Sequence, residues 1–279
     1  MPKLKFELRS SGYCTSLKNH AIAGAEKETI RFYATWAYIY HPDKGHILFD
    51  TGYSKRFYKA TEKFPASIYG KMTPTYIEEN EEAWFQLKQK GINPEDINYI
   101  IISHYHADHI AGLKDFPNAT FISGKSAYQD VKNKSGIAAV RRAFLPELLP
   151  YDFESRLQLV NITLGKKNDD HLGRMFDLFD DGTILLCDLT GHAKGQLGAL
   201  LRTENGKVLL AADAAWLKEN YQEMRLPTQM VRLFFDNWSD YKVSLKKVHD
   251  FSLANSEVVI VPCHCRATLE RVGTLIDVD

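Results

Sequence analysis

The stretch IISHYHADHIAGL, residues 101–113, places three histidines and an aspartate within six positions, directly after an apolar run. That run, INYIII, is short and rich in isoleucine, which is typical of a buried strand. His104 and His106 alternate at its end, so both side chains can point toward one centre. Asp108 and His109 follow where the chain should turn into a helix. Because neutral imidazole and carboxylate are good ligands for Zn²⁺ and neighbouring divalent metals, the stretch predicts a metal site.

The alternative is a cluster of surface histidines that binds nothing. Several polar rings buried without partners would destabilise the fold, and a metal ion would remove that penalty. The context also favours a metal, because an apolar strand precedes the cluster and a small-residue turn with a predicted helix follows it. Two adjacent metals would explain why the ligands are so densely spaced.

Three further residues share one signature, in which an apolar strand is followed by a candidate ligand and then by a turn. His192 lies in LTGHAKGQLG, Asp213 follows the strand in VLLAADAAW, and His264 follows the strand in VVIVPCHC. Taken singly, each would more often be structural, but together they extend the cluster to the set that a dinuclear site requires. The histidines without this placement are interpreted as surface or core residues: His20, His41, His46, His171 and His249.

Composition limits the classes of function. Hydrophobic residues make up 44% of the 279 positions and charged residues 25%, which is ordinary for a globular protein, and the length suits a single domain over residues 1–279. Lys plus Arg and Asp plus Glu both number 35, and the zero net charge argues against general nucleic-acid binding. Charges interrupt every apolar run near the N-terminus, and no stretch reaches the ~20 apolar residues of a membrane span. We therefore expect a cytoplasmic protein without a membrane partner.

The four cysteines are too few for a disulfide scaffold in a chain of this length. Cys263 and Cys265 flank His264, which raises the question of metal chemistry, but reduced and partly buried thiols are the favoured interpretation. Neither these residues nor Cys14 have a base and an orienting partner at a recognisable spacing. The sequence therefore predicts no cysteine nucleophile.

Secondary structure was predicted from periodicity and turn signals. Strands are expected in the ranges 3–8, 30–52 (two strands joined at PDKG), 97–102, 119–123, 182–189, 195–216 (a hairpin turning at ENG) and 257–263. Helices are expected over 76–90, where Gly91 closes the helix, from 109 onward, over most of 126–150, over much of 217–253 and over 266–273. Two strand-rich halves that each carry helices favour two sheets packed face to face with helices outside.

Five elements of the sequence match, in order, those of the metallo-β-lactamase superfamily. They are FDTG at 49–52, SHYHADH at 103–109, TGHAKGQLG at 190–198, AADAAW at 211–216 and PCHC at 262–265. This resemblance implies an α/β fold, the αββα four-layer sandwich, with a two-metal site on one edge.

The resemblance also implies roles for individual residues. His104, His106 and His192 would hold one metal, and Asp108, His109 and His264 would hold the second. Asp213 would bridge both metals, and Asp50 in FDTG would support the ligand loop from behind. The implied cofactor is a pair of divalent metal ions, with Zn²⁺ expected.

Two metals about 3.5–4 Å apart can share a water and generate a bridging hydroxide near neutral pH. We therefore expect hydrolysis of a carbonyl substrate, with Asp108 orienting the water and moving its proton as the catalytic residue. The resemblance to lactonases given below implies that this substrate is a lactone or related carboxylic ester, with an N-acyl homoserine lactone as the candidate. Two alternatives stay open: a metal-dependent phosphodiesterase, since the same geometry clamps phosphoryl oxygens, and a metal-bound ligand sensor without turnover.

Within the superfamily the chain most resembles N-acyl homoserine lactonases and related quorum-quenching lactonases. The aspartate at 213 differs from the cysteine of the main β-lactamase branch. One departure is Trp216, because those lactonases carry a tyrosine three residues after the bridging aspartate. An indole N–H can also donate a hydrogen bond, so Trp216 is a candidate substrate-binding residue, and Tyr221 is a second candidate that could supply the missing phenol.

Two segments rich in aromatic and aliphatic residues, 126–151 and 216–238, allow two interpretations. They could form a lid, with a helical insert around 126–151, over a pocket for an acyl chain. The favoured interpretation is that they cover the sandwich or contact a second copy of the chain in a homodimer.

Overall fold

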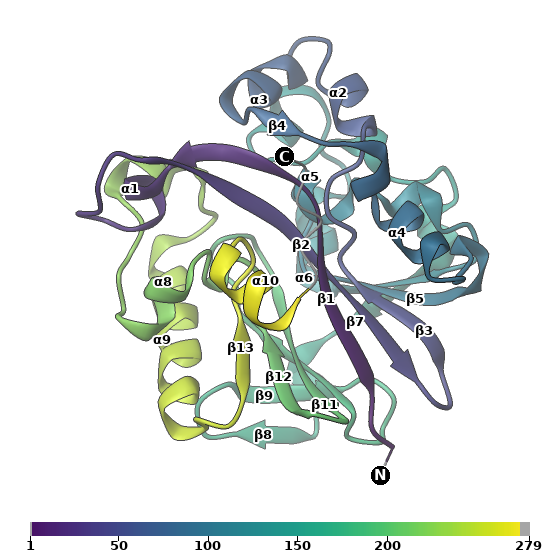
Figure 1. Cartoon of the computed structure of the whole chain (residues 1–279). Coiled ribbons are helices and arrows are strands. Elements are labelled where there is room, and N and C mark those ends of the chain that lie inside the picture. The colour runs from purple at the N-terminus through teal and green to yellow at the C-terminus, as the bar shows by residue number, and fades with distance from the viewer. Residues whose placement is uncertain (1, 274–279) are drawn as a thin grey trace.

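Two β-sheets pack face to face in the computed structural model, with helices on both outer faces (Figure 1). The structure describes residues 2–273. This arrangement confirms the predicted αββα sandwich.

The first sheet has seven strands in the order β4-β1-β2-β3-β5-β6-β7. Its strands are β1 Lys5–Leu17, β2 Thr29–His41, β3 Gly45–Phe49, β4 Thr75–Tyr76, β5 Ile97–Ile102, β6 Thr120–Gly124 and β7 Leu157–Val160. The strands β3, β5, β6 and β7 run parallel to one another, so the carboxyl ends of β3 and β5 meet at one edge of the sheet.

The second sheet has six strands in the order β13-β12-β11-β10-β9-β8. Its strands are β8 Lys167–Asp169, β9 Gly173–Asp177, β10 Ile184–Asp188, β11 Leu197–Thr203, β12 Gly206–Leu210 and β13 Val259–Val261. β12 and β13 are parallel, so their carboxyl ends also meet at one edge. The backbone N–H of Leu197, where β11 begins, donates a 2.9 Å hydrogen bond to the carbonyl of Ser103, just after β5, and so joins this edge to that of the first sheet.

The alternation of side chains along β2 and β5 explains the layers. In β2, Tyr33, Ala37 and Ile39 face the cluster between the sheets, whereas Trp36 and Tyr38 face the helices. In β5 the isoleucines 100 and 102 point to the helical side and isoleucine 101 points between the sheets. Because successive strand residues alternate faces, an uninterrupted apolar run is the pattern of a strand buried on both sides.

Ten α-helices and eight short 3₁₀ segments connect the strands of residues 2–273. The α-helices are α1 Lys18–Ala21, α2 Arg56–Ala60, α3 Ala66–Met72, α4 Ala83–Gln89, α5 Ala107–Ile110, α6 Lys125–Val131, α7 Gly136–Val140, α8 Lys218–Gln222, α9 Trp238–Ala254 and α10 Arg266–Val272. The 3₁₀ segments are η1 Glu79–Glu81, η2 Pro94–Asp96, η3 Leu113–Asp115, η4 Pro146–Leu148, η5 Phe153–Arg156, η6 Ile162–Leu164, η7 Ala212–Ala214 and η8 Gln229–Phe234.

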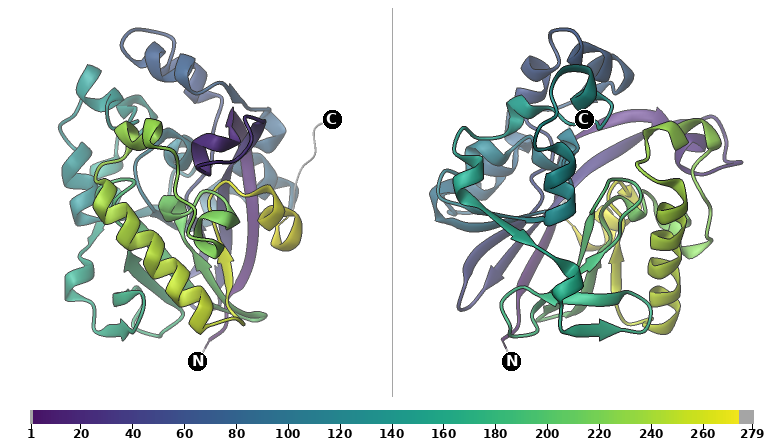
Figure 2. Two further views of the ribbon diagram at one scale, coloured as in Figure 1. Left: turned by 90° about the vertical axis from the view of Figure 1, so that its left-hand side faces the viewer. Right: turned by 180° about the vertical axis from the view of Figure 1, so that it is seen from behind.

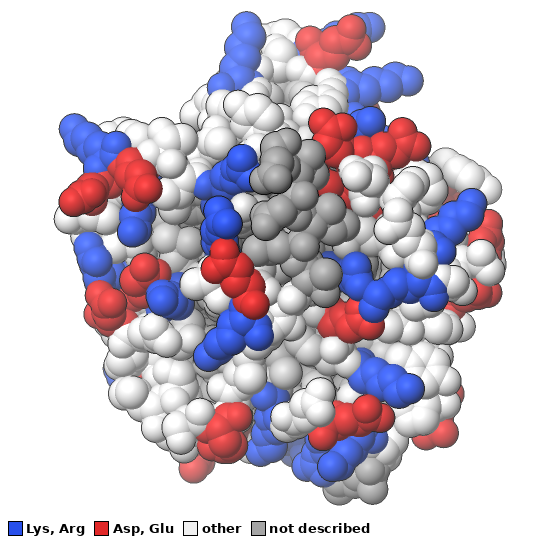
Figure 3. All heavy atoms as spheres, in the orientation of Figure 1, with Lys and Arg blue, Asp and Glu red and all other residues white. Residues whose placement is uncertain are grey.

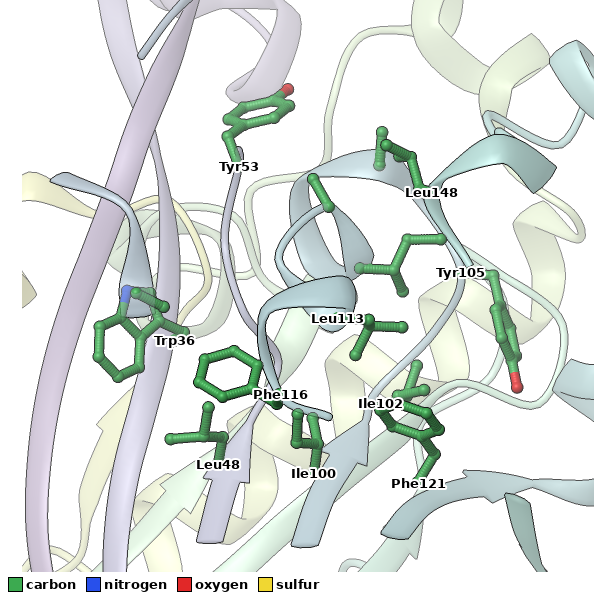
Figure 4. Close-up of a cluster of buried hydrophobic side chains, with 14 of the residues drawn as sticks. Trp36, Leu48, Tyr53, Ile100, Ile102, Tyr105, Leu113, Phe116, Phe121 and Leu148 are labelled. Carbon is green, nitrogen blue, oxygen red and sulfur yellow. The ribbon is translucent and has the colours of Figure 1, made fainter. Parts of the chain in front are cut away.

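The two helical layers cover opposite faces of the sandwich. Over the first sheet, Leu113, Phe116 and Leu148 meet the side chains of Ile100 and Ile102 (Figure 4). Over the second sheet, α9 buries Tyr241, Leu245 and Val248, and it lies along the outer face of that sheet (Figure 2).

Some predicted elements were wrong in extent. The helix predicted over 76–90 begins only at Ala83, because Tyr76 belongs to β4, which pairs with Tyr13 in β1. The helical range 126–150 is divided into α6, α7 and η4, and the range 217–253 contains an irregular stretch between α8 and α9. β7, β8 and β9 were missed, since strands of three to five residues carry little periodicity.

Within residues 2–273, no helix is both long and apolar enough to cross a membrane. Basic and acidic side chains are interspersed over the face shown in Figure 3, in agreement with the neutral composition.

Candidate metal centre

The predicted ligands converge at the edge where the strand ends of both sheets meet. Each follows a strand directly: His104 after β5, His192 between β10 and β11, Asp213 after β12 and His264 after β13. Their ring and carboxylate atoms form two compact groups that could each hold a metal ion.

The first group is His104, His106 and His192, whose ligand atoms lie within 4.8 Å of one another. Nε2 of His192 is 3.0 Å from Nδ1 of His106, and the rings of His104 and His106 are 4.4 Å apart between centroids. Three imidazoles at this spacing match the three-histidine set that zinc binds in proteins.

The second group is His109, Asp213, Cys263 and His264, also within 4.8 Å of one another. Asp108 adjoins it, with Oδ2 at 3.5 Å from Nε2 of His109 and 3.8 Å from Nε2 of His264. All residues that the sequence predicted for the second metal therefore lie together. Cys263 was not predicted as a member.

Asp213 lies between the two groups. Its Oδ2 is 3.1 Å from Nε2 of His192 in the first group and 3.3 Å from Nε2 of His264 in the second. Its Oδ1 is 3.3 Å from Nε2 of His109. One buried carboxylate thus faces ligands of both groups.

Asp50 fixes the orientation of two ligands, His109 directly and His104 through Ser103. Oδ1 and Oδ2 of Asp50 accept hydrogen bonds from the backbone N–H and the hydroxyl of Ser103, at 2.8 and 2.7 Å. Oδ2 also accepts from Nδ1–H of His109 at 2.7 Å. Since the Ser103 proton is engaged by Asp50, its oxygen can accept from Nδ1–H of His104, 3.0 Å away. Nε2 of both His104 and His109 is then the nitrogen directed into the site, and it offers a lone pair to a metal when the ring is neutral.

The third histidine with a fixed tautomer is His264. Its Nδ1–H donates to the carbonyl of Tyr33 at 2.8 Å, so Nε2 is the free nitrogen. Its backbone N–H donates to the carbonyl of Trp216 at 3.0 Å, which holds the segment after β13 beside the segment after β12.

Three buried polar atoms of the candidate ligands have no hydrogen-bond partner among the described residues. They are Nε2 of His104, which is fully buried, Nδ1 of His192 and Oδ1 of Asp213. Buried polar atoms normally have a hydrogen-bond partner. Buried atoms that lack one in the protein therefore indicate a ligand that the protein itself does not supply. A cation between these atoms fits, because a lone pair and a carboxylate oxygen are both donors to a metal.

The charges of the site favour positive charge at its centre. Burial opposes ionisation of Asp108, but His109 and His264 outweigh it and lower its pKa to about 2. Burial likewise opposes the charged form of Asp213, yet His264, His192 and His109 hold its pKa well below the usual value. For His106, burial and then His192 lower the pKa to about 3, so this imidazole stays neutral and able to bind a metal at neutral pH.

The backbone is strained at two points of the site. Asp50 and Ala212 have φ angles of 59° and 45°, a region that residues with a side chain rarely adopt. Asp50 binds Ser103 and His109, and Ala212 directly precedes Asp213. Strained backbone of this kind usually occurs at functional sites. Gly191, next to His192, is needed for a different reason, because a Cβ there would lie 2.0 Å from the backbone nitrogen of Tyr241.

Trp216 lies beside the centre, as its position after Asp213 suggested. Its Nε1–H donates to Oδ2 of Asp213 at 2.9 Å, and its ring is 5.7 Å from that of His192. Phe235 completes this wall, with its ring 4.9 Å from His192 and 5.4 Å from Trp216.

Tyr221 lies elsewhere. It is buried on α8 in the cluster between the second sheet and α9, and its hydroxyl accepts a 3.4 Å hydrogen bond from Gln222. Its carbonyl accepts from Nδ1–H of His249 on α9 at 2.6 Å. The suggestion that Tyr221 supplies a phenol at the metals does not fit this placement, because α8 directs the ring into the core.

A cavity of about 80 Å³ opens onto His106 and His192. α6, the loop after α7 and the residues after η8 form its other walls. Arg142 bridges two of these walls by binding Asp236 and, at 3.0 Å, Asp130. The 126–151 segment therefore both covers the first sheet, through buried residues such as Tyr128 and Phe144, and lines the entrance to the site.

Sequence reasoning missed Ser103, Cys263 and Phe235 as members of the site. A usable signal existed for the first two, since each directly precedes a predicted ligand at a strand end. For Phe235 there was none, because its position depends on how the irregular stretch between α8 and α9 folds back.

Comparison with known families agrees with this geometry. The model of the metallo-beta-lactamase superfamily matches residues 30–254 of the chain. N-acyl homoserine lactonase AttM of Azorhizobium caulinodans is 31% identical over 196 residues, which cover 68% of this chain and 67% of AttM.

Solved structures share the fold at lower identity. An N-acyl homoserine lactone hydrolase with N-hexanoyl-L-homoserine bound at its catalytic metal centre has a TM-score of 0.75 and 19% identity, covering 99% of each chain. AidC, a dizinc quorum-quenching lactonase, has a TM-score of 0.65 and 16% identity, covering 94% of this chain and 88% of AidC.

Proposed function

The chain belongs to the metallo-beta-lactamase superfamily, and we propose that it is a dinuclear-metal-dependent hydrolase that opens a lactone or a related carboxylic ester. The observation that carries this proposal is the carboxylate of Asp213, which lies within 3.3 Å of histidines from both ligand groups. A carboxylate shared in this way suits two metals about 3.5–4 Å apart. AttM, a lactonase, and AidC, a dizinc lactonase, support the choice of substrate and metal.

The assignment of ligands follows the two groups. His104, His106 and His192 would hold one ion, Asp108, His109 and His264 would hold the other, and Asp213 would be a ligand common to both. Zinc is the proposed metal, because imidazole nitrogens dominate both groups and carboxylates complete them. Asp50 acts through Ser103 and His109, where it keeps the ligand nitrogens correctly oriented.

When bound, the two ions activate a water and polarise the substrate carbonyl. Asp108 is the residue of this chain best placed to handle the proton. Its side chain is partly exposed, whereas His109 beside it is fully buried, so Asp108 is the more accessible of the two to water. It accepts the proton of the attacking water and returns it to the ring oxygen as the ring carbon–oxygen bond breaks. One water is consumed, and the product is a hydroxy acid.

The substrate side is formed by Trp216 and Phe235 next to His192. These rings offer an apolar surface beside the reacting carbonyl, and the indole N–H is engaged by Oδ2 of Asp213. An acyl chain fits such a wall better than a phosphodiester does, which is why lactones, N-acyl homoserine lactones first among them, are the proposed substrates.

A substrate panel combined with metal analysis tests this function. Protein loaded with zinc should contain about two ions per chain and hydrolyse lactones faster than an aryl phosphodiester. Faster phosphodiester cleavage would assign the phosphodiesterase alternative. Full metal content with turnover of neither substrate class would assign a metal-bound sensor.

A further inference from the structure

Cys263 is a buried thiol that the proposed ligand assignment does not use. It directly precedes His264, and its backbone is fixed on both sides: its N–H donates to the carbonyl of Ala215 at 3.0 Å, and its carbonyl accepts from the hydroxyl of Thr35 at 2.6 Å. The sulfur is therefore held near the second ligand group by the fold.

The position of the sulfur suits coordination. Sγ lies 3.8 Å from Nε2 of His109, and it is within 4.8 Å of the ligand atoms of Asp213 and His264. Zinc–sulfur and zinc–nitrogen bonds of about 2.3 and 2.0 Å at a tetrahedral angle place the two ligand atoms roughly 3.5 Å apart. The observed separation needs only a small adjustment to reach that value.

A second observation points to a ligand at the same place. Oδ1 of Asp213 is buried and accepts no hydrogen bond from any described residue, although Nε2 of His109 is 3.3 Å away. Sγ of Cys263 and this unpartnered carboxylate oxygen both lie beside Nε2 of His109, at 3.8 and 3.3 Å.

We propose that Sγ of Cys263 is a further ligand of the second metal, in addition to Asp108, His109, Asp213 and His264 assigned above. This inference rests on the proposed dinuclear site. The sulfur binds as a thiolate, so the thiol proton is released to solvent as the sulfur–metal bond forms. With a sulfur ligand the second position favours zinc over harder ions such as Mn²⁺ or Ca²⁺.

The competing explanation is that Cys263 is a small apolar residue in the core, which is common for a free cysteine. Cys265 provides the comparison, because it is equally buried only two positions further along. It packs among apolar residues, including Phe32 and Leu217, and it is not among the residues of the second group.

Zinc X-ray absorption of the fully loaded protein tests the proposal directly. One sulfur per two zinc ions should appear as a scattering shell at about 2.3 Å, beside the nitrogen and oxygen shell near 2.0–2.1 Å. Cobalt-loaded protein should show a sulfur-to-cobalt charge-transfer band. Both signals should vanish in Cys263→Ala and Cys263→Ser and persist in Cys265→Ala and Cys14→Ala. Zinc affinity at the second position should fall by about 10- to 100-fold in Cys263→Ala.

The wild-type spectrum decides the matter even where a variant fails to fold. Two zinc ions per chain without a sulfur shell would overturn the role of Cys263 while leaving the dinuclear hydrolase intact. A sulfur signal that is lost in Cys14→Ala and retained in Cys263→Ala would also overturn it. Failure to load two metals would instead contradict the proposed function itself.

Discussion

The indole N–H of Trp216 donates a 2.9 Å hydrogen bond to Oδ2 of Asp213, the same oxygen that faces His192 and His264. This bond limits rotation of the carboxylate and leaves Oδ1 directed toward His109. The tryptophan thus acts on the carboxylate that faces both ligand groups and also forms part of the proposed substrate wall.

Trp216→Phe should remove this hydrogen bond while keeping an aromatic ring. A bond to a charged acceptor is worth about 1.5–3 kcal/mol, so kcat/KM for lactones should fall by roughly 10- to 100-fold with little change in the melting temperature. Trp216→Tyr is the matched variant, and it should change the ranking of lactone substrates. Loss of stability by about 1–3 kcal/mol with an unchanged ranking would mean that Trp216 is only a packing residue.

Asp213→Ala should lower both metal content and turnover. Without the shared carboxylate, the two groups lose their common ligand and the buried histidines face each other without an anion. Elemental analysis of the purified variant should give clearly fewer than two metals per chain, with turnover reduced by at least about 100-fold. A folded variant with two metals and normal activity would contradict the bridging role. Asp188→Ala, at the end of β10, is a control that should leave metal content unchanged.

Removal of metal should destabilise the protein as well as inactivate it. A ligand that binds only the native state at 1,000 times its Kd adds about 4 kcal/mol to the free energy of unfolding. In a chain of this size that corresponds to a melting temperature higher by on the order of 10 °C. Calorimetry before and after dialysis against a chelator measures the difference, and readdition of zinc should restore it. An unchanged melting temperature after complete metal removal would show that the buried cluster is stable by itself.

Arg142→Ala should alter substrate binding more than stability. Arg142 connects Asp130 on α6 with Asp236 beside Phe235, across the entrance to the cavity. Partly exposed ion pairs contribute only about 0–1 kcal/mol, so the melting temperature should change little. KM for long-chain lactones should change severalfold at constant kcat, because one wall of the entrance is released. Arg142→Lys retains the charge but cannot bind two carboxylates with a planar fork, so it should behave in an intermediate way.

The hydrogen bonds of Asp181, which lies outside the candidate metal centre, predict that the free energy of unfolding depends on pH. Its carboxylate accepts from the backbone and hydroxyl of Thr183 and from Nε2–H of His41, whose Nδ1 accepts from the backbone of Asp43 and Lys44. Burial opposes ionisation of Asp181, but the Thr183 and His41 hydrogen bonds outweigh it and lower its pKa.

The pKa of Asp181 is lower in the folded protein than in the unfolded chain. Its contribution to the free energy of unfolding is therefore fully present above the unfolded pKa of about 3.9, and it is lost as the pH falls through the folded pKa. Asp181→Asn should therefore reduce the free energy of unfolding by about 1 kcal/mol at pH 7 and by less at pH 3. Chemical denaturation at the two pH values measures this. An equal loss at both pH values would show that the effect does not depend on charge.

Strand ends and ligand types were predictable because they are local. The apolar run before His104 and the alternation of His104 and His106 are visible within a few residues, and the same holds for Asp213 after its strand. The division of ligands into two groups came from the family resemblance. The structure brings His104, His106 and His192 into one group, and His109, Asp213 and His264 into another that also contains Cys263.

Features that depend on distant contacts were not predictable. Tyr221 points into the core because α8 packs against α9, and nothing near residue 221 indicates that contact. The late start of α4 depends on β4 pairing with β1, which is about 60 residues earlier in the chain. Cys263 was interpreted as a reduced, partly buried thiol. The direction of its side chain is set by backbone hydrogen bonds to Thr35 and Ala215, which are distant in sequence.

The convergence of strand ends from both sheets has a consequence for how the chain is held together. His104 and His264 are 160 positions apart in sequence, and the four cysteines all lie within the described residues without forming a disulfide. The proposed metal pair, held by both segments, would close a long loop of the chain, and closing such a loop restricts the unfolded ensemble in the way a disulfide does. Unlike a disulfide, this cross-link would not open under a reducing potential; it would open when a competing chelator removes the ions, so metal supply would control it.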